Sequence, residues 1–140
     1  MIEEMEDLQE TYPRAGKFKL GDSKELCDRL NGMVRLGHKT ATCDALVNYN
    51  TEPEAMHKVG RCHIAAYWQD VPALVIGSIC VDKIRFRDVG KEIALAEGEN
   101  LDLEGWREDQ KVFFGRNGGF DPEIILLFEH FELVEDLADR

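Results

Sequence analysis

The sequence predicts an α+β domain built around a small, strongly bent sheet. Its predicted segments follow the order helix, strands, helices, strand, which is typical of this fold class. With 140 residues, of which 44% are hydrophobic and 32% charged, the chain has the size and composition of one globular domain. We therefore expect a single domain over residues 1–140, with no second domain of appreciable size.

The first predicted element is an amphipathic helix that begins near Asp22. Asp22-Ser23-Lys24-Glu25 is typical of a helix start, because Asp22 can cap the helix and Glu25 can reach back to the cap. Gly37 is a natural C-terminal stop. Between these ends, one helical face is apolar and predicts burial against the sheet, with Leu26, Leu30, Met33 and Val34.

Strands are predicted in the middle of the chain. Residues 40–47 include a candidate strand, and residues 51–60, with Pro53 and Gly60, predict a loop. The alternation of Cys62, Ile64, Ala66 and Trp68 is typical of a half-buried strand. After a turn at residues 70–72, the nearly continuous apolar run 73–81 predicts a central strand, which residues 83–87 carry toward solvent.

The second half predicts two helices and a last strand. Residues 89–96 suggest a short helix, and a longer one follows until the glycines of residues 115–119 end it. Residues 124–128 form an apolar strand, beyond which apolar and polar residues interleave. One face of the longer helix carries Leu103, Trp106, Gln110, Phe113 and Phe114.

The formal charge of −11 is concentrated at the two ends of the chain. Residues 1–10 hold five acids and no Lys or Arg, and residues 121–140 hold seven acids against Arg140. Residues 11–120 balance at 16 acids and 16 bases, so a local basic face for nucleic acid is compatible with the sequence, as are ordinary solvated side chains. The candidates for that face are Lys17, Lys19, Lys24, Arg29, Arg35 and Lys39.

Location and cysteine use follow from the same composition. The first residues are acidic where a secretory leader would be basic, and no apolar run approaches the roughly 18 residues that span a bilayer, so we expect a cytoplasmic protein without a membrane partner. The four cysteines are spaced by 16, 19 and 18 residues, which is poor zinc spacing. Small buried side chains are the expected role, and Cys43 is the only one considered as a nucleophile.

Two short segments contain the residues that can carry chemistry. Gly37-His38-Lys39-Thr40-Ala41-Thr42 supplies an amine and a hydroxyl, and the later Ala96-Glu97-Gly98-Glu99-Asn100 supplies carboxylates. These groups suffice for hydrolysis if the fold brings them together. Lys39 and Thr42 would lie on opposite faces of a regular strand, so a shared site requires irregular backbone here.

Each candidate has an ordinary structural alternative. Lys39 could be a solvated loop lysine and Thr42 a simple strand residue. Glu97 and Glu99 could simply stabilise the N-terminus of the following helix through its dipole, or could bind Mg²⁺ or Mn²⁺ with their oxygen atoms. Tyr49 is the aromatic residue best placed to stack on a base, and His38 is the histidine with a suggestive position.

In these segments the chain resembles the ASCH family, small domains of the PUA-like superfamily associated with RNA. Residues 37–42 fit the family's Gly-x-Lys-x-x-Thr motif, and residues 20–23 resemble the Phe-Gly-Asp segment of its longer bacterial members. The later acidic block, Trp106-Arg107, Phe113-Phe114 and the strand 124–128 also fit, so the match covers most of the chain. The resemblance implies a small bent β-barrel with flanking helices and a cleft between the two motifs.

Two activities are implied by the resemblance. One is hydrolysis of the acetyl amide of N4-acetylcytidine, and the other is cleavage of single-stranded RNA, for which Mn²⁺ or Mg²⁺ is a candidate cofactor. The matching catalytic positions are Lys39, Thr42 and Glu99, and the expected substrate-binding positions are Gly37, His38, Tyr49 and Glu97. The partner is then RNA or a modified nucleoside, and a non-catalytic RNA-binding or nucleobase-binding module is the alternative.

The chain departs from the family pattern at two places. Gln110 stands where longer members often carry a histidine. Cys43 and Asp44 follow the motif where short amidohydrolase members place an arginine, which removes an anion or carbonyl contact. The absence of that arginine brings the chain closer to the longer members and favours RNA as substrate.

Overall fold

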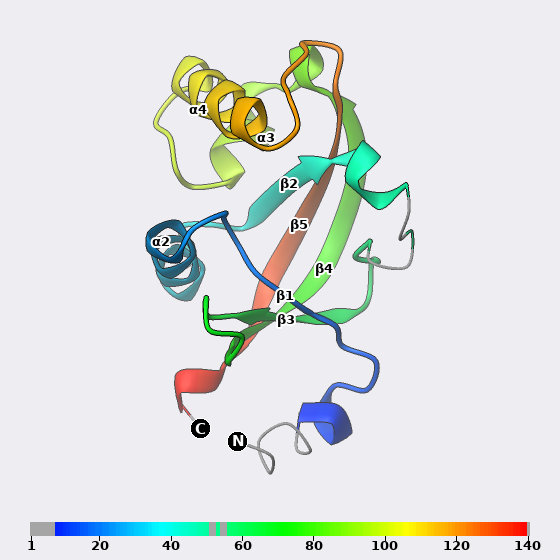
Figure 1. Ribbon diagram of the computed structural model, residues 1–140. Coiled ribbons are helices and arrows are strands. Elements are labelled where there is room, and N and C mark those ends of the chain that lie inside the picture. The colour runs from blue at the N-terminus through cyan, green and yellow to red at the C-terminus, as the bar shows by residue number, and fades with distance from the viewer. Residues whose placement is uncertain (1–7, 51–52, 54–55, 140) are drawn as a thin grey trace.

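A curled, open sheet forms the centre of the molecule. The computed structural model describes residues 8–50, 53 and 56–139. The sheet has the strand order β1-β3-β4-β5-β2, with β1 and β2 at its edges (Figure 1). The strands are β1 (Lys17–Phe18), β2 (Ala41–Ala45), β3 (Cys62–Ala66), β4 (Pro72–Arg85) and β5 (Ile125–Asp136). The predicted α+β class is confirmed. The predicted bent barrel is a curled sheet that does not close.

The long strands β4 and β5 bend because their register shifts twice, between Val75 and Ile76 and between Ser78 and Cys80. Such bulges increase the local twist and curve a sheet.

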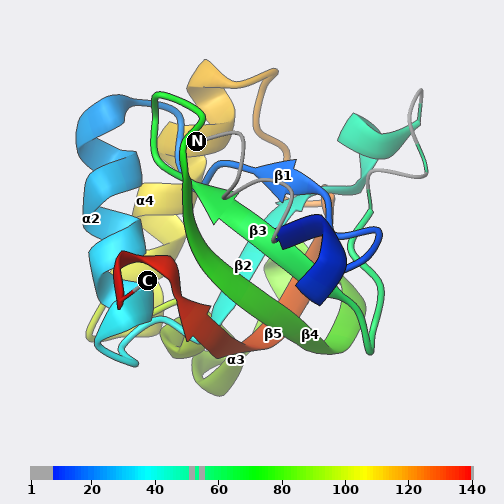
Figure 2. The same ribbon diagram turned by 90° about the horizontal axis from the view of Figure 1, so that it is seen from below.

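The helices are α2 (Lys24–Arg35), α3 (Lys91–Ala96) and α4 (Leu103–Arg116). Figures 1 and 2 show α2 and α4 on the same side of the curled sheet, where they enclose the space over β2.

Helix α2 begins one residue later than expected. Ser23, not Asp22, is the N-cap, and its hydroxyl accepts a hydrogen bond from the Leu26 N–H at 3.2 Å. The Asp22 carboxylate is drawn away by Arg116, whose Nε donates to it at 2.6 Å. Two adjacent residues could have capped the helix, and the partner from α4 decides between them.

The end of α2 positions the first motif. Gly37 adopts a φ of +77°, its N–H donates to the Val34 carbonyl at 3.0 Å, and the His38 N–H donates to the Met33 carbonyl at 2.9 Å. This pair of bonds is the Schellman arrangement, which favours glycine because L side chains rarely adopt a positive φ. Gly37 therefore ends the helix as predicted and turns the chain toward β2.

Strand β3 is buried on both faces, whereas the sequence predicted a half-buried strand. Ala65 packs into the core cluster under α2, and Ile64 packs into a second cluster with Leu8 and Leu137. The face with Ala65 was expected to meet solvent, and the core cluster that includes Leu30 and Val34 of α2 covers it. Trp68, which the sequence placed in this strand, lies beyond its end and is partly exposed.

The remaining predicted elements agree with the structure, with one difference in length. The strand predicted for residues 124–128 continues as β5 to Asp136, because its second half pairs with β4. In the predicted loop 51–60, residues 51, 52, 54 and 55 lie outside the described residues. Among the described residues, no helix is long and apolar enough to cross a membrane.

Candidate active site

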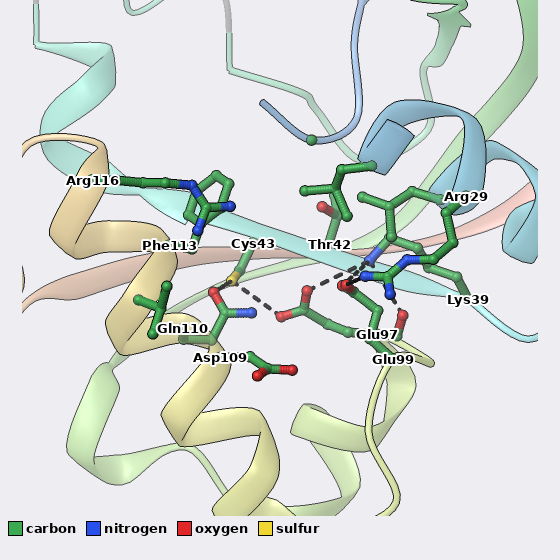
Figure 3. A pocket seen from close by; sticks show the side chains of 14 residues that line it. Arg29, Lys39, Thr42, Cys43, Glu97, Glu99, Asp109, Gln110, Phe113 and Arg116 are labelled. Carbon is green, nitrogen blue, oxygen red and sulfur yellow. Dashed lines mark hydrogen bonds and ion pairs between the residues drawn. The ribbon is translucent and has the colours of Figure 1, made fainter. Parts of the chain in front are cut away.

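A pocket of about 360 Å³ lies between α2, β2, the α3–α4 connection and α4 (Figure 3). Lys39, Thr42, Glu97 and Glu99 all line it, so the fold brings both sequence motifs to one place. Its volume is at the small end of the range for small-molecule sites. Further lining residues include Arg29, Cys43, Asp109, Gln110, Phe113 and Arg116.

Lys39 is held inside this pocket by oxygen atoms from the second motif. Its side chain is 1% exposed, and its Nζ lies 3.3 Å from the Glu97 carbonyl oxygen, 3.5 Å from Glu97 Oε2 and 3.7 Å from Glu99 Oε2. Because Lys39 precedes β2 in an irregular turn, it can share a pocket with Thr42, which lies within the strand. The irregular backbone that the spacing required is therefore present.

Backbone contact fixes the distance between the two motifs. The Thr40 N–H donates to the Ala96 carbonyl at 2.9 Å. Gly98 has a φ of +82°, and a Cβ at this position would lie 2.1 Å from the His38 carbonyl oxygen. Only glycine permits this approach, and the approach brings the carboxylates on either side of Gly98 to Lys39.

Glu97 is an anchor whose two carboxylate oxygens both have protein partners. Oε1 accepts from Trp106 Nε1 at 2.9 Å and from the Cys43 thiol at 3.2 Å, and Oε2 pairs with Lys39. The residue is 3% exposed. Substrate binding by Glu97 stays a prediction, because the residue lines the pocket while both of its carboxylate oxygens contact protein groups.

Glu99 is the more available carboxylate of the pair. It pairs with Lys39 on one side and with Arg29, at 3.2 Å, on the other, and its side chain is 18% exposed. Burial raises the pKa of Glu99 above its usual value, and the neighbouring Lys39 opposes that rise. A carboxyl group with a raised pKa can hold a proton and deliver it, which suits a general acid.

Cys43 is a hydrogen-bonded thiol with little nucleophilic character. Burial, followed by the neighbouring Glu97 carboxylate, raises its pKa well above the usual value. Since the thiolate is the reactive form, this setting disfavours attack by Cys43. In the described part of the chain the four cysteines are free thiols.

A second pocket, of about 340 Å³, lies on the other side of Thr42. Thr42 and Cys43 line both pockets, and Tyr49 lines only the second. Burial raises the pKa of the Tyr49 hydroxyl, and the Asp44 carboxylate raises it further. Tyr49 is therefore not brought together with Lys39 and Glu99.

The wall of the second pocket contains a cluster that the sequence analysis missed. His57 Nδ1 lies 2.7 Å from Glu129 Oε1, and the His63 ring stacks on His57 with centroids 3.7 Å apart. Burial, followed by the charge of His57, lowers the pKa of His63 to about 4. These residues come from a loop, β3 and β5, so no local spacing revealed them, and Glu129 is cross-strand from Thr42.

Two other predicted positions act through the backbone. Gly37 and His38 are exposed and do not line either pocket. Gly37 ends α2, and the His38 carbonyl contacts the Gly98 turn, so the structure gives both residues a positioning role.

The cations proposed for a basic face have partners in the structure. Lys19 pairs with Asp70, Lys24 with Asp28, Arg29 with Glu99, Arg35 with Asp136 and Lys39 with both glutamates, and Lys17 donates to the Asp70 carbonyl. The first pocket itself balances three cations, Arg29, Lys39 and Arg116, against Glu97, Glu99 and Asp109. Its formal charge is therefore neutral.

Side chains that could bind a metal ion lie beside both pockets. The oxygen cluster considered at Glu97 and Glu99 already surrounds the Lys39 amine, which would compete with a cation. Among the described residues, the group that could hold an ion is His57, His63 and Glu129.

The comparisons with known proteins agree with one another. A model of the ASCH domain matches residues 17–135. The structure resembles the crystal structure of an ASCH domain from Lactobacillus crispatus JV V101, with a TM-score of 0.79 and 25% identity over 91% of this chain and 84% of the other. It also resembles a protein from Enterococcus faecalis V583, with a TM-score of 0.83 and 28% identity over 99% and 89% of the two chains. No curated protein sequence matches this chain.

Proposed function

The chain belongs to the ASCH domain family, and we propose that its first pocket hydrolyses an amide on a modified nucleobase, with N4-acetylcytidine as the expected substrate. The observation that carries this proposal is the convergence of Lys39, Thr42 and Glu99 on one small pocket. An amine, a hydroxyl and a proton-carrying carboxyl group are the parts that acyl transfer requires.

The charge balance of the pocket supports a neutral substrate over a polyanion. Three cations and three carboxylates line it, and the cations are already paired with Glu99, Glu97 and Asp22. Binding a phosphate backbone would require several of these pairs to exchange partners, at a cost in pairing free energy. An uncharged nucleoside requires no such exchange.

The mechanism that we propose centres on Thr42. Lys39 passes a proton to Glu99, and the Thr42 hydroxyl then attacks the acetyl carbonyl while its own proton goes to Lys39. Glu99 then protonates the departing cytosine amine as the carbon–nitrogen bond breaks. Water attacks the acetyl-threonine ester and gives a proton to the Thr42 oxygen as the ester bond breaks, so acetic acid leaves and Thr42, Lys39 and Glu99 are back in their starting forms. Glu97 holds Lys39 in place throughout through its carbonyl and its Oε2.

Cleavage of single-stranded RNA is the second candidate. Arg29 has 62% of its side chain exposed at the rim, and the Arg116 guanidinium lies 5.2 Å from the Phe113 ring centroid. An arginine beside an aromatic ring suits stacking on a base and contact with a phosphate. This rim supports an RNA substrate, whereas the pocket interior supports a nucleobase.

One mass-spectrometric experiment separates the candidates. The protein is incubated with a single-stranded oligoribonucleotide that contains one N4-acetylcytidine, and in parallel with the free nucleoside. We expect loss of one acetyl group from an intact strand or nucleoside. Fragmented strands would instead establish the ribonuclease, and unchanged substrates that still bind would establish a binding module.

Three variants make the experiment specific to the proposed groups. Lys39→Arg keeps the positive charge but cannot accept a proton at neutral pH, so turnover should be lost while binding persists. Thr42→Val removes the attacking hydroxyl with little change of shape. Lys111→Arg, on an exposed residue of α4, is the matched control and should retain full turnover. Retained turnover in Lys39→Arg would contradict the general-base role.

A further inference from the structure

We propose that His57, His63 and Glu129 form a binding site for Zn²⁺ in the wall of the second pocket. Their candidate ligand atoms lie within 4.8 Å of one another. Two imidazoles and one carboxylate are a ligand set that zinc uses when it keeps a fourth position open. This site is separate from the Lys39 pocket and does not depend on the proposed hydrolysis.

The strongest support comes from His63, a buried side chain with an unpartnered ring nitrogen. His63 is 7% exposed, and its Nε2 has no hydrogen-bond partner among the residues that the structure describes. A buried polar atom without a partner destabilises the fold, because it has lost its hydrogen bonds to water. The ring also makes a hydrogen bond to the Lys58 backbone, which must involve the other nitrogen, Nδ1.

This arrangement fixes the tautomer that a metal needs. Nδ1 carries the hydrogen that is donated to the backbone, so Nε2 presents its lone pair. Histidine ligands in metal sites commonly donate their second ring N–H to a carbonyl or a carboxylate in this way. The lone pair of His63 is thus available to a metal ion, since no donor from the described part of the chain bonds to it.

Glu129 has the support that a ligating carboxylate requires. It is 5% exposed, Ser78 Oγ donates to its Oε2, and its Oε1 faces His57 Nδ1 at 2.7 Å. The serine holds one oxygen, which leaves the other for the ion. One carboxylate with two neutral imidazoles leaves a bound Zn²⁺ with a net charge of +1, which water or an anion at the open position can offset.

Entry of the ion requires the His57 ring to move. The planes of the His57 and His63 rings differ by only 7° and their centroids are 3.7 Å apart, so one ion cannot lie in both planes. Zn–N distances of about 2.0–2.1 Å also imply ligand atoms about 3.3 Å apart. His57 follows a loop and is less buried than His63, so its ring is the one that rotates out of the stack.

The chemistry of the ligands favours zinc over magnesium. Imidazole nitrogens suit Zn²⁺, whereas Mg²⁺ demands near-octahedral oxygen ligands. Since His57 and Glu129 line the second pocket, the open position of the ion would face that pocket, on the side of Thr42 away from Lys39. The site would take a ligand with a metal-binding oxygen, such as a carboxylate or a phosphate.

Cobalt spectroscopy tests the ligand set directly. The full chain is treated with a chelator and titrated with Co²⁺, then with Zn²⁺ in competition, and with Mg²⁺ in a separate sample. We expect one Co²⁺ per chain, with a visible spectrum typical of nitrogen and oxygen ligands, displacement by Zn²⁺ and no response to Mg²⁺. A thiolate charge-transfer band would place the ion at a cysteine and would overturn the proposal.

Variants complete the test. His57→Ala and Glu129→Gln should each weaken Zn²⁺ binding at least tenfold, while His38→Ala, at an exposed histidine elsewhere, should leave it unchanged. His57 lies outside the strands, so its variant tests the ligand even if a change at buried His63 disturbs folding. Unchanged affinity in His57→Ala and Glu129→Gln would refute the site, as would the failure of the wild-type chain to bind Zn²⁺ in the micromolar range.

Discussion

Two clusters of charged and polar groups flank Thr42, and they differ in how completely the protein satisfies them. On one side, Lys39 and Arg29 balance Glu97 and Glu99, and Trp106 and Cys43 complete the contacts of Glu97. On the other side, the His63 ring nitrogen Nε2 has no partner within residues 8–50, 53 and 56–139. The first cluster needs no further charged partner, whereas the second lacks one.

This difference indicates different kinds of ligand for the two pockets. A cluster that is already neutral and hydrogen-bonded can accept a neutral molecule without losing its own pairs. A cluster with a free lone pair beside a carboxylate gains most from a cation. We therefore expect the two sides of Thr42 to respond differently to substitution, metal and pH.

The largest expected effect comes from removing the buried cation, Lys39, from the cluster that it forms with Glu97 and Glu99, which we call the complete cluster. Lys39→Met leaves two carboxylates in the pocket without their ammonium partner, and breaking a buried pair in this way costs about 3–5 kcal/mol. Urea unfolding followed by tryptophan fluorescence measures the change. Lys111→Met, which breaks an exposed pair on α4, is the control and should cost less than about 1 kcal/mol. Equal costs for the two variants would contradict the balance that we describe.

The next largest effect is the stabilisation of the incomplete cluster, which consists of His57, His63 and Glu129, by a metal ion. Zn²⁺ at one hundred times its dissociation constant should stabilise the folded chain by about 2.7 kcal/mol, because it binds the folded state alone. Differential scanning calorimetry with and without a chelator measures this stabilisation. The gain should vanish in Glu129→Gln and persist in Lys39→Arg. Loss of the gain in both variants would show that the two clusters are not independent.

A smaller effect should follow the protonation of Glu99. Because burial raises its folded-state pKa above the unfolded value of 4.5, the folded chain holds this proton more tightly than the unfolded chain. The resulting stabilisation is fully present below pH 4.5 and is lost as the pH rises through the folded-state pKa. Chemical unfolding at a series of pH values should show this decline, and Glu99→Gln should remove it. An unchanged profile in that variant would assign the decline to another group.

The smallest expected effect lies at the rim. Asp22→Asn breaks the ion pair that joins the start of α2 to the end of α4, with 48% of the arginine side chain exposed, so we expect a loss of about 1 kcal/mol or less. Hydrogen bonds from Arg116 lower the pKa of Asp22 to about 2 from 3.8. The contribution is therefore present above pH 3.8 and is lost as the pH falls toward 2. Thermal unfolding in high salt should reduce the difference between wild type and variant, and a larger loss would mean that this pair holds the pocket together.

The sequence predicted the complete cluster better than the incomplete one, for a physical reason. Lys39 and Thr42 belong to one short motif, and Glu97 and Glu99 belong to another, so each motif is visible locally. Their convergence was implied by the family resemblance, and the structure places both motifs around one pocket. The contact between Glu97 and Trp106 was missed because the sequence indicated Trp106 through the family pattern and the apolar face of a helix, and neither reveals a hydrogen bond to a carboxylate.

His57, His63 and Glu129 were missed because nothing local distinguishes them. Glu129 lies in the middle of β5, where its two oxygens meet a serine from β4 and a histidine from a loop. Such contacts depend on strand register, which the bulges in β4 and β5 alter. The burial of both faces of β3 was missed for a similar reason, because Ala65 on its second face packs in one cluster with Leu30 and Val34 of α2, which lie far from it in the sequence.

The glycine at position 98 has a consequence for how this protein can change in evolution. The turn there lies so close to the His38 backbone that a side chain at position 98 fits only if the two segments move apart. Gly98→Ala would thus disable the Lys39 pocket while leaving every reactive group in the chain. The spacing of the two glutamates is fixed by steric exclusion, so sequence drift can alter the rim of the pocket far more freely than its centre.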